Sequence, residues 1–208
     1  MKSEASRAEL QADDVLLTKL IAGGLDHSKW SFERIDASET RILNLACGTC
    51  REAEELADFF SGIASPFETR VSLIGIEKRL KALAFARRHF KSRPGRDFNF
   101  ICEDGREVGS IEEADGMFDV VVFRHQNYWQ DKPVWRALFA EGLAKLSPTG
   151  VMVVTSYFDK EHGLALGAIQ GIGGRILTTT RNEASRELPV EGKSVDRHVA
   201  LVNRYRVS

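Results

Sequence analysis

Small residues follow the first long apolar run of this sequence at a spacing typical of a ligand site. The apolar run at residues 42–45 leads into a turn of small residues at 46–50, around Gly48, and then into a helical pattern. A helix that begins just after such a turn points its unpaired N–H groups at whatever lies beyond the strand. The sequence therefore predicts a binding site at this turn.

Acidic residues close the next two apolar runs. Glu77 follows the second run, and Asp104 with Gly105 follows the third. A carboxylate such as Glu77 offers two oxygens and no donor, so it can accept two hydrogen bonds from a ribose diol. A pyrophosphate-binding turn would carry G-x-G-x-x-G, which lets the backbone approach the phosphates. The first turn supplies only Gly48, so a pyrophosphate is disfavoured.

Two thiols lie in the same turn, in the arrangement Cys47-Gly-Thr-Cys50. A thioredoxin-like dithiol occupies such a strand-to-helix junction, where the helix N-terminus lowers the pKa of the first thiol. Strand and helix keep alternating far beyond a thioredoxin-sized unit, so a thiol oxidoreductase is the less favoured alternative. No second pair of soft ligands lies at zinc-site spacing, so no metal site is predicted.

The elements that must position these residues alternate between strand and helix from residue 41 onward. Apolar runs predict strands, and i, i+3, i+4, i+7 patterns predict helices between them. The predicted strands lie at residues 42–45, 71–76, 98–102, 118–123 and 151–155. Such alternation predicts an open, mainly parallel sheet with helices on both faces. Ligands bind at the carboxyl ends of its strands, which here are residues 46–50, Glu77, Asp104 with Gly105, 124–127 and 156–159.

Both ends of the chain depart from this alternation. The first helical stripe is expected to end at Gly23 and Gly24. Residues 1–40 form an N-terminal arm that is expected to pack on the core or, alternatively, to act as a lid over the ligand. The last two β-rich runs, 175–180 and 198–207, have no helix between them, which predicts an antiparallel pair on the sheet edge.

Composition limits the class of protein and its surroundings. The 208 residues, 28% charged and 43% hydrophobic, are typical of a soluble domain. No apolar run approaches the roughly 20 residues that span a bilayer, and the N-terminus lacks the apolar core of a secretory signal. Three cysteines fit a reducing compartment. A cytoplasmic location without a membrane partner is therefore expected.

A basic run interrupts the near balance of 29 basic and 30 acidic residues. Residues 78–96 hold eight Lys or Arg in 19 positions, which suggests a contact with nucleic acid or an acidic partner. In a chain without net positive charge, such a run is more often a solvated helix face. A non-catalytic binding module that uses this face is kept as an alternative.

Five segments in order resemble the class I S-adenosylmethionine-dependent methyltransferase family. They are ILNLACGTC, VSLIGIE, FICEDG, FDVVVFRHQ and LSPTGVMVVTSY, which look like the family's first five strands with the residues after them. The last two strands also look like its closing hairpin, so the resemblance covers roughly residues 41–208. It implies one methyltransferase-like domain at 41–208. The implied fold is an open Rossmann-like sheet of seven strands, mainly parallel with a C-terminal antiparallel hairpin, with helices on both faces.

The resemblance implies a role for each matching residue. The cofactor would be S-adenosylmethionine, with its amino-acid end against the turn, its ribose on Glu77 and its adenine amine on Asp104. The other cofactor-binding residues implied are Asn44, Ala46, Cys47, Gly48, Gly105 and Arg124. The family usually has Asp or Glu in place of Asn44, and glycine in place of Ala46 and Cys50.

His125 is the predicted catalytic residue. Residues 124–126 would lie beside the transferring methyl group, and a histidine can act as a general base near neutral pH. A purely structural, hydrogen-bonded role for His125 is the alternative. No macromolecule-binding domain is recognisable in the sequence, which favours a small-molecule acceptor over nucleic acid. Tyr157 is one of several aromatic residues that could line the acceptor pocket.

Overall fold

The centre of the molecule is one mixed sheet. The computed structural model describes residues 5–28, 36, 38–63 and 70–204. Its strands are β1 Glu39–Leu45, β2 Arg70–Ile76, β3 Arg96–Ile101, β4 Phe118–Phe123, β5 Leu146–Ser156, β6 Gly174–Arg181 and β7 His198–Arg204. They lie in the order β3-β2-β1-β4-β5-β7-β6. β1 to β5 pair in parallel, and β7 is antiparallel to both β5 and β6. This confirms the predicted fold class, including the C-terminal hairpin.

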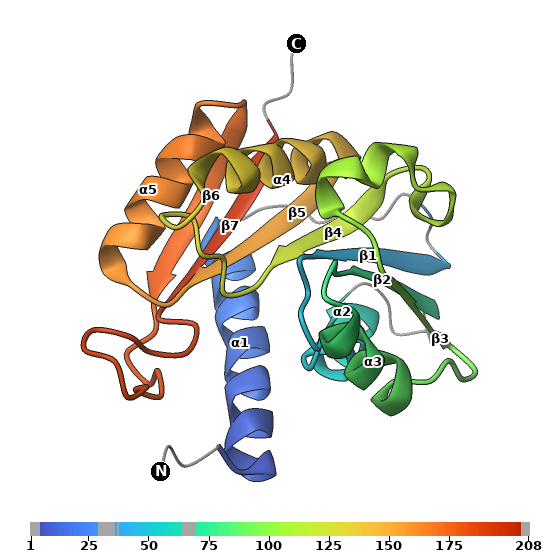
Figure 1. The fold of residues 1–208 in the computed structure, drawn as a ribbon, viewed down its shortest axis with the longest axis horizontal. Coiled ribbons are helices and arrows are strands. Elements are labelled where there is room, and N and C mark those ends of the chain that lie inside the picture. The colour runs from blue at the N-terminus through green and yellow to red at the C-terminus, as the bar shows by residue number, and fades with distance from the viewer. Residues whose placement is uncertain (1–4, 29–35, 37, 64–69, 205–208) are drawn as a thin grey trace.

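Helices cover both faces of the sheet (Figure 1). One face carries α1 Arg7–Ser28, α2 Ala53–Ile63 and α3 Leu80–His89. The other carries α4 Lys132–Lys145 and α5 Asp159–Gln170, together with the short 3₁₀ helices Gly105–Ser110 and Glu112–Ala114. No helix in the described part of the chain has the length and apolarity needed to cross a membrane.

Strand alternation divides the core into two layers, one on each side of the sheet. In β1, for example, Ile42 belongs to the layer under α1, α2 and α3, whereas Leu43 belongs to the layer under α4 and α5. Both side chains are fully buried, as expected for a parallel sheet covered on both faces. The two layers hold the strands rigidly, so the side chains at their carboxyl ends have fixed positions.

The helix α1 is longer than the sequence pattern predicts, because Gly23 and Gly24 lie inside it and do not end it. A Cβ on Gly24 would lie 2.9 Å from Leu201 Cδ1 and 3.0 Å from Thr178 Cγ2. Gly24 therefore allows the helix to approach β6 and β7 closely. Part of the predicted arm, residues 1–4, 29–35 and 37, lies outside the described residues, and its division from the rest at residue 40 remains a prediction.

The strand order reverses between β1 and β4. From β1 the chain moves outward through β2 to β3, and it then returns to β4 on the other side of β1. Helices that follow neighbouring strands in opposite directions leave a crevice at the carboxyl edge of such a sheet. The turn after β1 and the residues after β4 therefore face each other across this crevice.

Candidate active site

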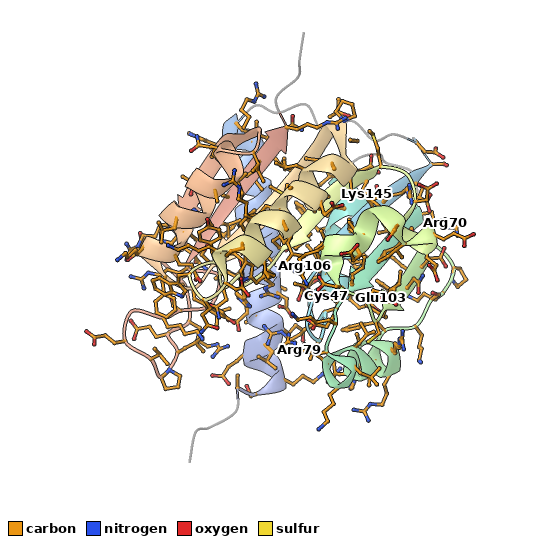
Figure 2. All side chains as sticks on the ribbon, turned by 45° about the horizontal axis from the view of Figure 1, so that its top comes forward. Cys47, Arg70, Arg79, Glu103, Arg106 and Lys145 are labelled. Atoms are coloured by element: carbon orange, nitrogen blue, oxygen red, sulfur yellow. The ribbon has the colours of Figure 1, made fainter. Side chains whose placement is uncertain are left out.

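A cavity of about 1310 Å³ opens at this edge of the sheet. Its wall contains every predicted site residue except Asn44, namely Ala46, Cys47, Gly48, Glu77, Asp104, Gly105, Arg124 and His125. Figure 2 shows that Cys47, Arg79 and Arg106 occupy the same central region of that view, although they come from different segments. Residues that are as much as 79 positions apart in the sequence thus surround one space.

The first turn, residues 46–52, has a backbone that glycine would adopt more easily. Ala46 has a φ of 54° and Cys50 a φ of 47°, on either side of Gly48 at 59°. These values lie in the left-handed region, which costs about 1–2 kcal/mol for a residue with a Cβ. The turn therefore has the backbone geometry of a glycine-rich loop at Ala46 and Cys50, the two positions where the resemblance implies glycine.

Glu77 is buried at the end of β2 and accepts hydrogen bonds on both oxygens. Its Oε2 accepts from the backbone N–H of Gly48 at 2.9 Å and from Arg79 Nη2 at 3.0 Å. Its Oε1 accepts from Arg79 N at 2.8 Å and Arg79 Nε at 2.9 Å. Burial alone would raise the pKa of Glu77, but these hydrogen bonds outweigh it and lower the pKa. Glu77 is therefore ionised at neutral pH and joins the first turn to β2.

Asp104 is held in the same way by the arginine two positions later. Arg106 Nη2 donates to Asp104 Oδ2 at 2.7 Å, and the Arg106 backbone N–H donates to Oδ1 at 3.0 Å. The Arg106 guanidinium is the main reason that the pKa of Asp104 is lowered to about 2. Both acids that the resemblance assigns to the nucleoside thus carry an arginine that a ligand would have to displace.

Arg124 lies at the centre of a buried ionic cluster that the sequence did not predict. Its guanidinium contacts Asp14 of α1, Glu52 of the first turn at 3.2 Å, and Asp196 of the loop before β7 at 2.6 Å. The Arg124 side chain is only 3% exposed, so these contacts are poorly screened by solvent. Arg124 therefore cannot use its guanidinium freely for a ligand and instead joins three distant segments beneath the cavity.

His125 faces the cavity with a carboxylate beside it. Its Nε2 lies 2.9 Å from Asp196 Oδ1, in an electrostatic contact without the geometry of a directed hydrogen bond. Its ring stacks on Tyr157 at 4.3 Å between centroids, and its backbone N–H donates to Thr155 Oγ1 at 2.9 Å. Burial alone would raise the pKa of Asp196, but Arg124 and His125 together hold it well below its usual range.

Asn44 does not line the cavity. It is fully buried at the end of β1, and its Nδ2 donates to Glu52 Oε1 at 2.6 Å and to Cys50 Sγ at 3.3 Å. The direct contact with the cofactor's ammonium, which the resemblance implies for this position, therefore has no support from the position of Asn44.

The thiols have contacts that do not favour redox chemistry. Cys47 and Cys50 are free, and Cys50 is fully buried. Burial, followed by the neighbouring Cys47, raises the pKa of Cys50 well above its ordinary value. A resolving thiolate is thereby disfavoured at this position.

The basic run is partly neutralised by contacts within the chain. Arg93 forms two hydrogen bonds with Glu54, and Arg96 contacts Asp58 and Ser61. Arg87 donates to the carbonyl oxygen of Phe100 at 2.7 Å. The alternative of a nucleic-acid-binding face therefore has fewer free charges than the sequence suggests.

Comparison with known proteins agrees with this architecture. Residues 42–150 match the family model described as "Methyltransferase domain". That segment is more than half of the chain, and the chain therefore belongs to the methyltransferase domain family. Among curated protein sequences, none matches the chain significantly.

Solved structures resemble the fold at low sequence identity. An S-adenosylmethionine-dependent methyltransferase from Clostridium acetobutylicum is 12% identical with a TM-score of 0.62, over 91% of both chains. The N-methyltransferase NodS from Bradyrhizobium japonicum is 14% identical with a TM-score of 0.61, over 90% of this chain and 93% of its own. An rRNA methylase from Streptococcus thermophilus is 10% identical with a TM-score of 0.56, over 98% of this chain and all of its own. The fold is that of class I methyltransferases.

Sequence reasoning missed three members of the site. Asp14, Glu52 and Asp196 lie in a helix, a turn and a loop, and no periodicity links them. Glu52 was the easiest to find, since it directly follows the predicted turn. For Asp14 and Asp196 the sequence carries no signal, because only the packing of α1 and β7 brings them to Arg124.

Proposed function

We propose that the protein transfers a methyl group from S-adenosylmethionine to a small-molecule acceptor in the cytoplasm. The observation that carries the proposal is that Ala46, Glu77 and Asp104 lie around one cavity at the point where the strand order reverses. Open parallel sheets bind nucleotide-like ligands at that point. Membership of the methyltransferase domain family supports the same reaction.

The residues around the cavity fit a nucleoside cofactor. The cavity is larger than the roughly 300–1,000 Å³ of a typical ligand site, so it has room for a cofactor and an acceptor together. Glu77 presents two buried oxygens of the kind that accept from a ribose diol. Arg79 now pairs with both, but its side chain is 68% exposed. Because the guanidinium is exposed, it can move into solvent when a diol takes its place, while the backbone N–H groups of Gly48 and Arg79 keep their hydrogen bonds to Glu77.

His125 is proposed as the general base. When bound, S-adenosylmethionine supplies an activated methyl group on a sulfonium, and the chain must hold the acceptor in line with it. The position of Asp196 beside Nε2 favours the tautomer with the proton on Nε2. Nδ1 then carries the lone pair that can take a proton from the acceptor.

The acceptor is proposed to occupy the part of the cavity between α1 and the loop that joins β6 to β7. Leu10 lines this part from α1, and Leu188, Pro189 and Val195 line it from the loop. Glu9, Arg186 and Glu187 line it as well, so this part of the cavity offers a small organic molecule both apolar surface and charged groups. In this arrangement α1, the described helix of the N-terminal arm, packs on β6 and β7 and forms a wall of the acceptor pocket.

Calorimetry with S-adenosylhomocysteine tests the cofactor. The wild-type protein should bind it saturably, and Glu77→Ala should weaken binding by at least about tenfold, because one hydrogen bond to a charged group is worth roughly 1.5–3 kcal/mol. Glu103→Ala is the matched control, since Glu103 is an exposed acid that follows β3 and does not line the cavity. Its binding should remain as in the wild type.

The alternatives predict different outcomes. No heat at millimolar S-adenosylhomocysteine would overturn the enzyme proposal and favour a binding module. A thiol oxidoreductase would lose its activity in Cys47→Ser, whereas the proposed methyltransferase should keep cofactor binding in that variant, because the turn at residues 46–50 is expected to meet the cofactor through its backbone. An rRNA acceptor, which the Streptococcus thermophilus neighbour brings into consideration, would show as methyl incorporation into RNA from a radiolabelled donor.

A further inference from the structure

The carboxamide of Asn44 and the carboxylate of Glu52 form a matched pair. Asn44 Nδ2 donates to Glu52 Oε1 at 2.6 Å, and both residues are buried, at 0% and 4% exposure. An acid at position 44 would place two carboxylates against each other at this distance. Two such groups cannot both ionise, since each raises the pKa of the other. Positions 44 and 52 therefore share one negative charge, which this chain carries on Glu52.

Glu52 has acceptor capacity left for a ligand. A carboxylate offers about four lone-pair sites, and the contacts with Asn44 and with Arg124 Nη1 at 3.2 Å use two of them. Glu52 lines the cavity, whereas Asn44 lies beneath it. The remaining lone pairs of Glu52 are thus anionic acceptors at the cavity wall, next to the first turn.

The surroundings of Glu52 leave negative charge uncompensated. The linked cluster contains four carboxylates and three guanidiniums, namely Asp13, Asp14, Glu52, Asp196, Arg51, Arg124 and Arg186. His125 would cancel the surplus charge only in its protonated form. The centre of the cluster at Arg124, Glu52 and Asp196 is buried, so one unmatched formal negative charge beside it favours the binding of a cation.

We propose that Glu52 binds the ammonium of the cofactor's amino-acid end, with Asn44 as the residue that positions the carboxylate. This inference rests on the proposed function, since S-adenosylmethionine and S-adenosylhomocysteine both carry that ammonium beside the thioether or sulfonium. In this arrangement the negative charge that the resemblance implies at position 44 lies on Glu52, and Asn44 keeps a role as its hydrogen-bond donor.

Two ligands separate this role from a general structural one. S-adenosylhomocysteine carries the amino acid, whereas 5′-methylthioadenosine keeps the nucleoside and the sulfur but lacks it. In calorimetry, Glu52→Gln should weaken S-adenosylhomocysteine binding by roughly 10- to 100-fold, the range for a hydrogen bond to a charged group. Its affinity for 5′-methylthioadenosine should remain within about twofold of wild type, since that ligand has no ammonium.

Glu54→Gln is the matched control. Glu54 lies two positions further on, in the first turn of α2, and pairs with Arg93 outside the cavity. It should leave both affinities unchanged. Unaltered binding of S-adenosylhomocysteine by Glu52→Gln would overturn the inference, and so would equal weakening of both ligands. A wild-type protein that binds neither ligand would overturn the proposed function as well.

A charge exchange provides the second test. Asn44→Asp alone should lower the thermal midpoint, because it opposes two buried carboxylates. The double variant Asn44→Asp with Glu52→Gln keeps the hydrogen bond and the single charge, so it should recover much of the midpoint. Its affinity for S-adenosylhomocysteine should stay as low as that of Glu52→Gln, because position 44 does not line the cavity. A double variant that binds S-adenosylhomocysteine as tightly as the wild type would contradict Glu52 as the ammonium ligand.

Discussion

Four residues with a side chain adopt the left-handed backbone region in the described part of the chain. They are Ala46, Cys50, His125 and Asp196. Ala46 and His125 line the cavity, Asp196 contacts His125, and Cys50 accepts from Asn44 just beneath it. Such conformations persist only where the surrounding structure holds them, and they concentrate at functional sites. The strain in this fold is thus gathered around one cavity.

Replacing Ala46 by glycine should stabilise the protein. Relief of about 1–2 kcal/mol of strain outweighs the roughly 0.4–1 kcal/mol that glycine costs through the unfolded chain. The free energy of unfolding in urea should therefore rise by roughly 0.5–1 kcal/mol. Ala84→Gly, on the exposed side of α3, is the control and should lower it by about 0.8–1 kcal/mol. A loss of stability in Ala46→Gly would show that the turn is not strained.

Individual site residues were predictable from the sequence only where they directly follow a predicted strand. Glu77 and Asp104 directly follow apolar strands, so the fold class alone places them at the carboxyl edge. Their pairing with Arg79 and Arg106 was not predictable, because a side chain two positions away can point toward or away from its neighbour. Asn44 was assigned to the ligand by resemblance, and its contact with Glu52 depends on the path of the turn.

At the scale of elements, periodicity succeeded where one face of a helix is apolar. In α2 the predicted stripe of Ala53, Leu56, Ala57 and Phe60 is the buried face. In α1 the stripe expected at Val15, Leu16, Leu20 and Ile21 is fully buried only at Ile21, because the buried face also holds Asp13, Asp14 and Gly24 beside Leu17 and Leu25. Asp13 and Asp14 are buried in ion pairs, and Gly24 is buried where the helix approaches the sheet. Because these residues are not hydrophobic, a search for hydrophobic periodicity does not detect the buried face.

Two adjacent glycines in α1 should respond in opposite ways to alanine. Gly24→Ala forces a Cβ against Leu201 and Thr178, and overpacking costs about 1–3 kcal/mol. Gly23 is exposed and a Cβ there meets nothing within 4 Å, so Gly23→Ala should gain roughly 0.5–1 kcal/mol from helix propensity. Urea denaturation followed by circular dichroism measures both. Equal effects would mean that α1 is not packed on the sheet through Gly24.

At the scale of the whole molecule, the sheet was predictable from the sequence pattern, but the positions of its last two strands were not. Alternation of strand and helix leads to a parallel sheet by the handedness of βαβ units, and the lack of a final helix leads to an antiparallel pair. Nothing in the sequence states that β7 lies between β5 and β6. That order depends on which edge buries more apolar surface, which only the assembled sheet determines.

Two neighbouring groups in α5 give the whole molecule opposing pH responses. Glu161 is fully buried, and burial raises its pKa to about 7, although the Lys193 charge lowers it in part. His162 contacts Ser156 and Thr179, and burial followed by the charge of His198 lowers its pKa to about 4. The Glu161 contribution to stability is lost as pH rises toward 7, whereas that of His162 is lost as pH falls toward 4. Between pH 4 and 7, ionisation of Glu161 lowers the free energy of unfolding as the pH rises, whereas loss of the proton from His162 raises it.

Single substitutions should reveal each slope. Glu161→Gln has no carboxyl group to ionise, so it should not lose stability as the pH rises. The difference between its free energy of unfolding and that of the wild type should therefore grow by about 2 kcal/mol from pH 4.5 to 7, after allowance for solvent screening. His162→Gln should gain relative to wild type as pH falls from 6.5 to 4. Urea midpoints across pH 4 to 8 give both curves. A Glu161→Gln curve parallel to that of wild type would contradict an elevated pKa.

The position of β7 also determines when the protein can become complete during synthesis. Until residues 198–204 leave the ribosome, β5 has no partner on one side, and its residues from Met152 to Ser156 present an open strand edge. The α1 helix is made before β6 and β7, the strands on which it packs, and Arg124 is made 72 residues before its partner Asp196. Such non-local closure slows folding and exposes strand edges to aggregation. A nascent chain that stops before β7 therefore has the strands that carry Glu77 and Asp104 but lacks the strand that joins β5 to β6 and supports α1.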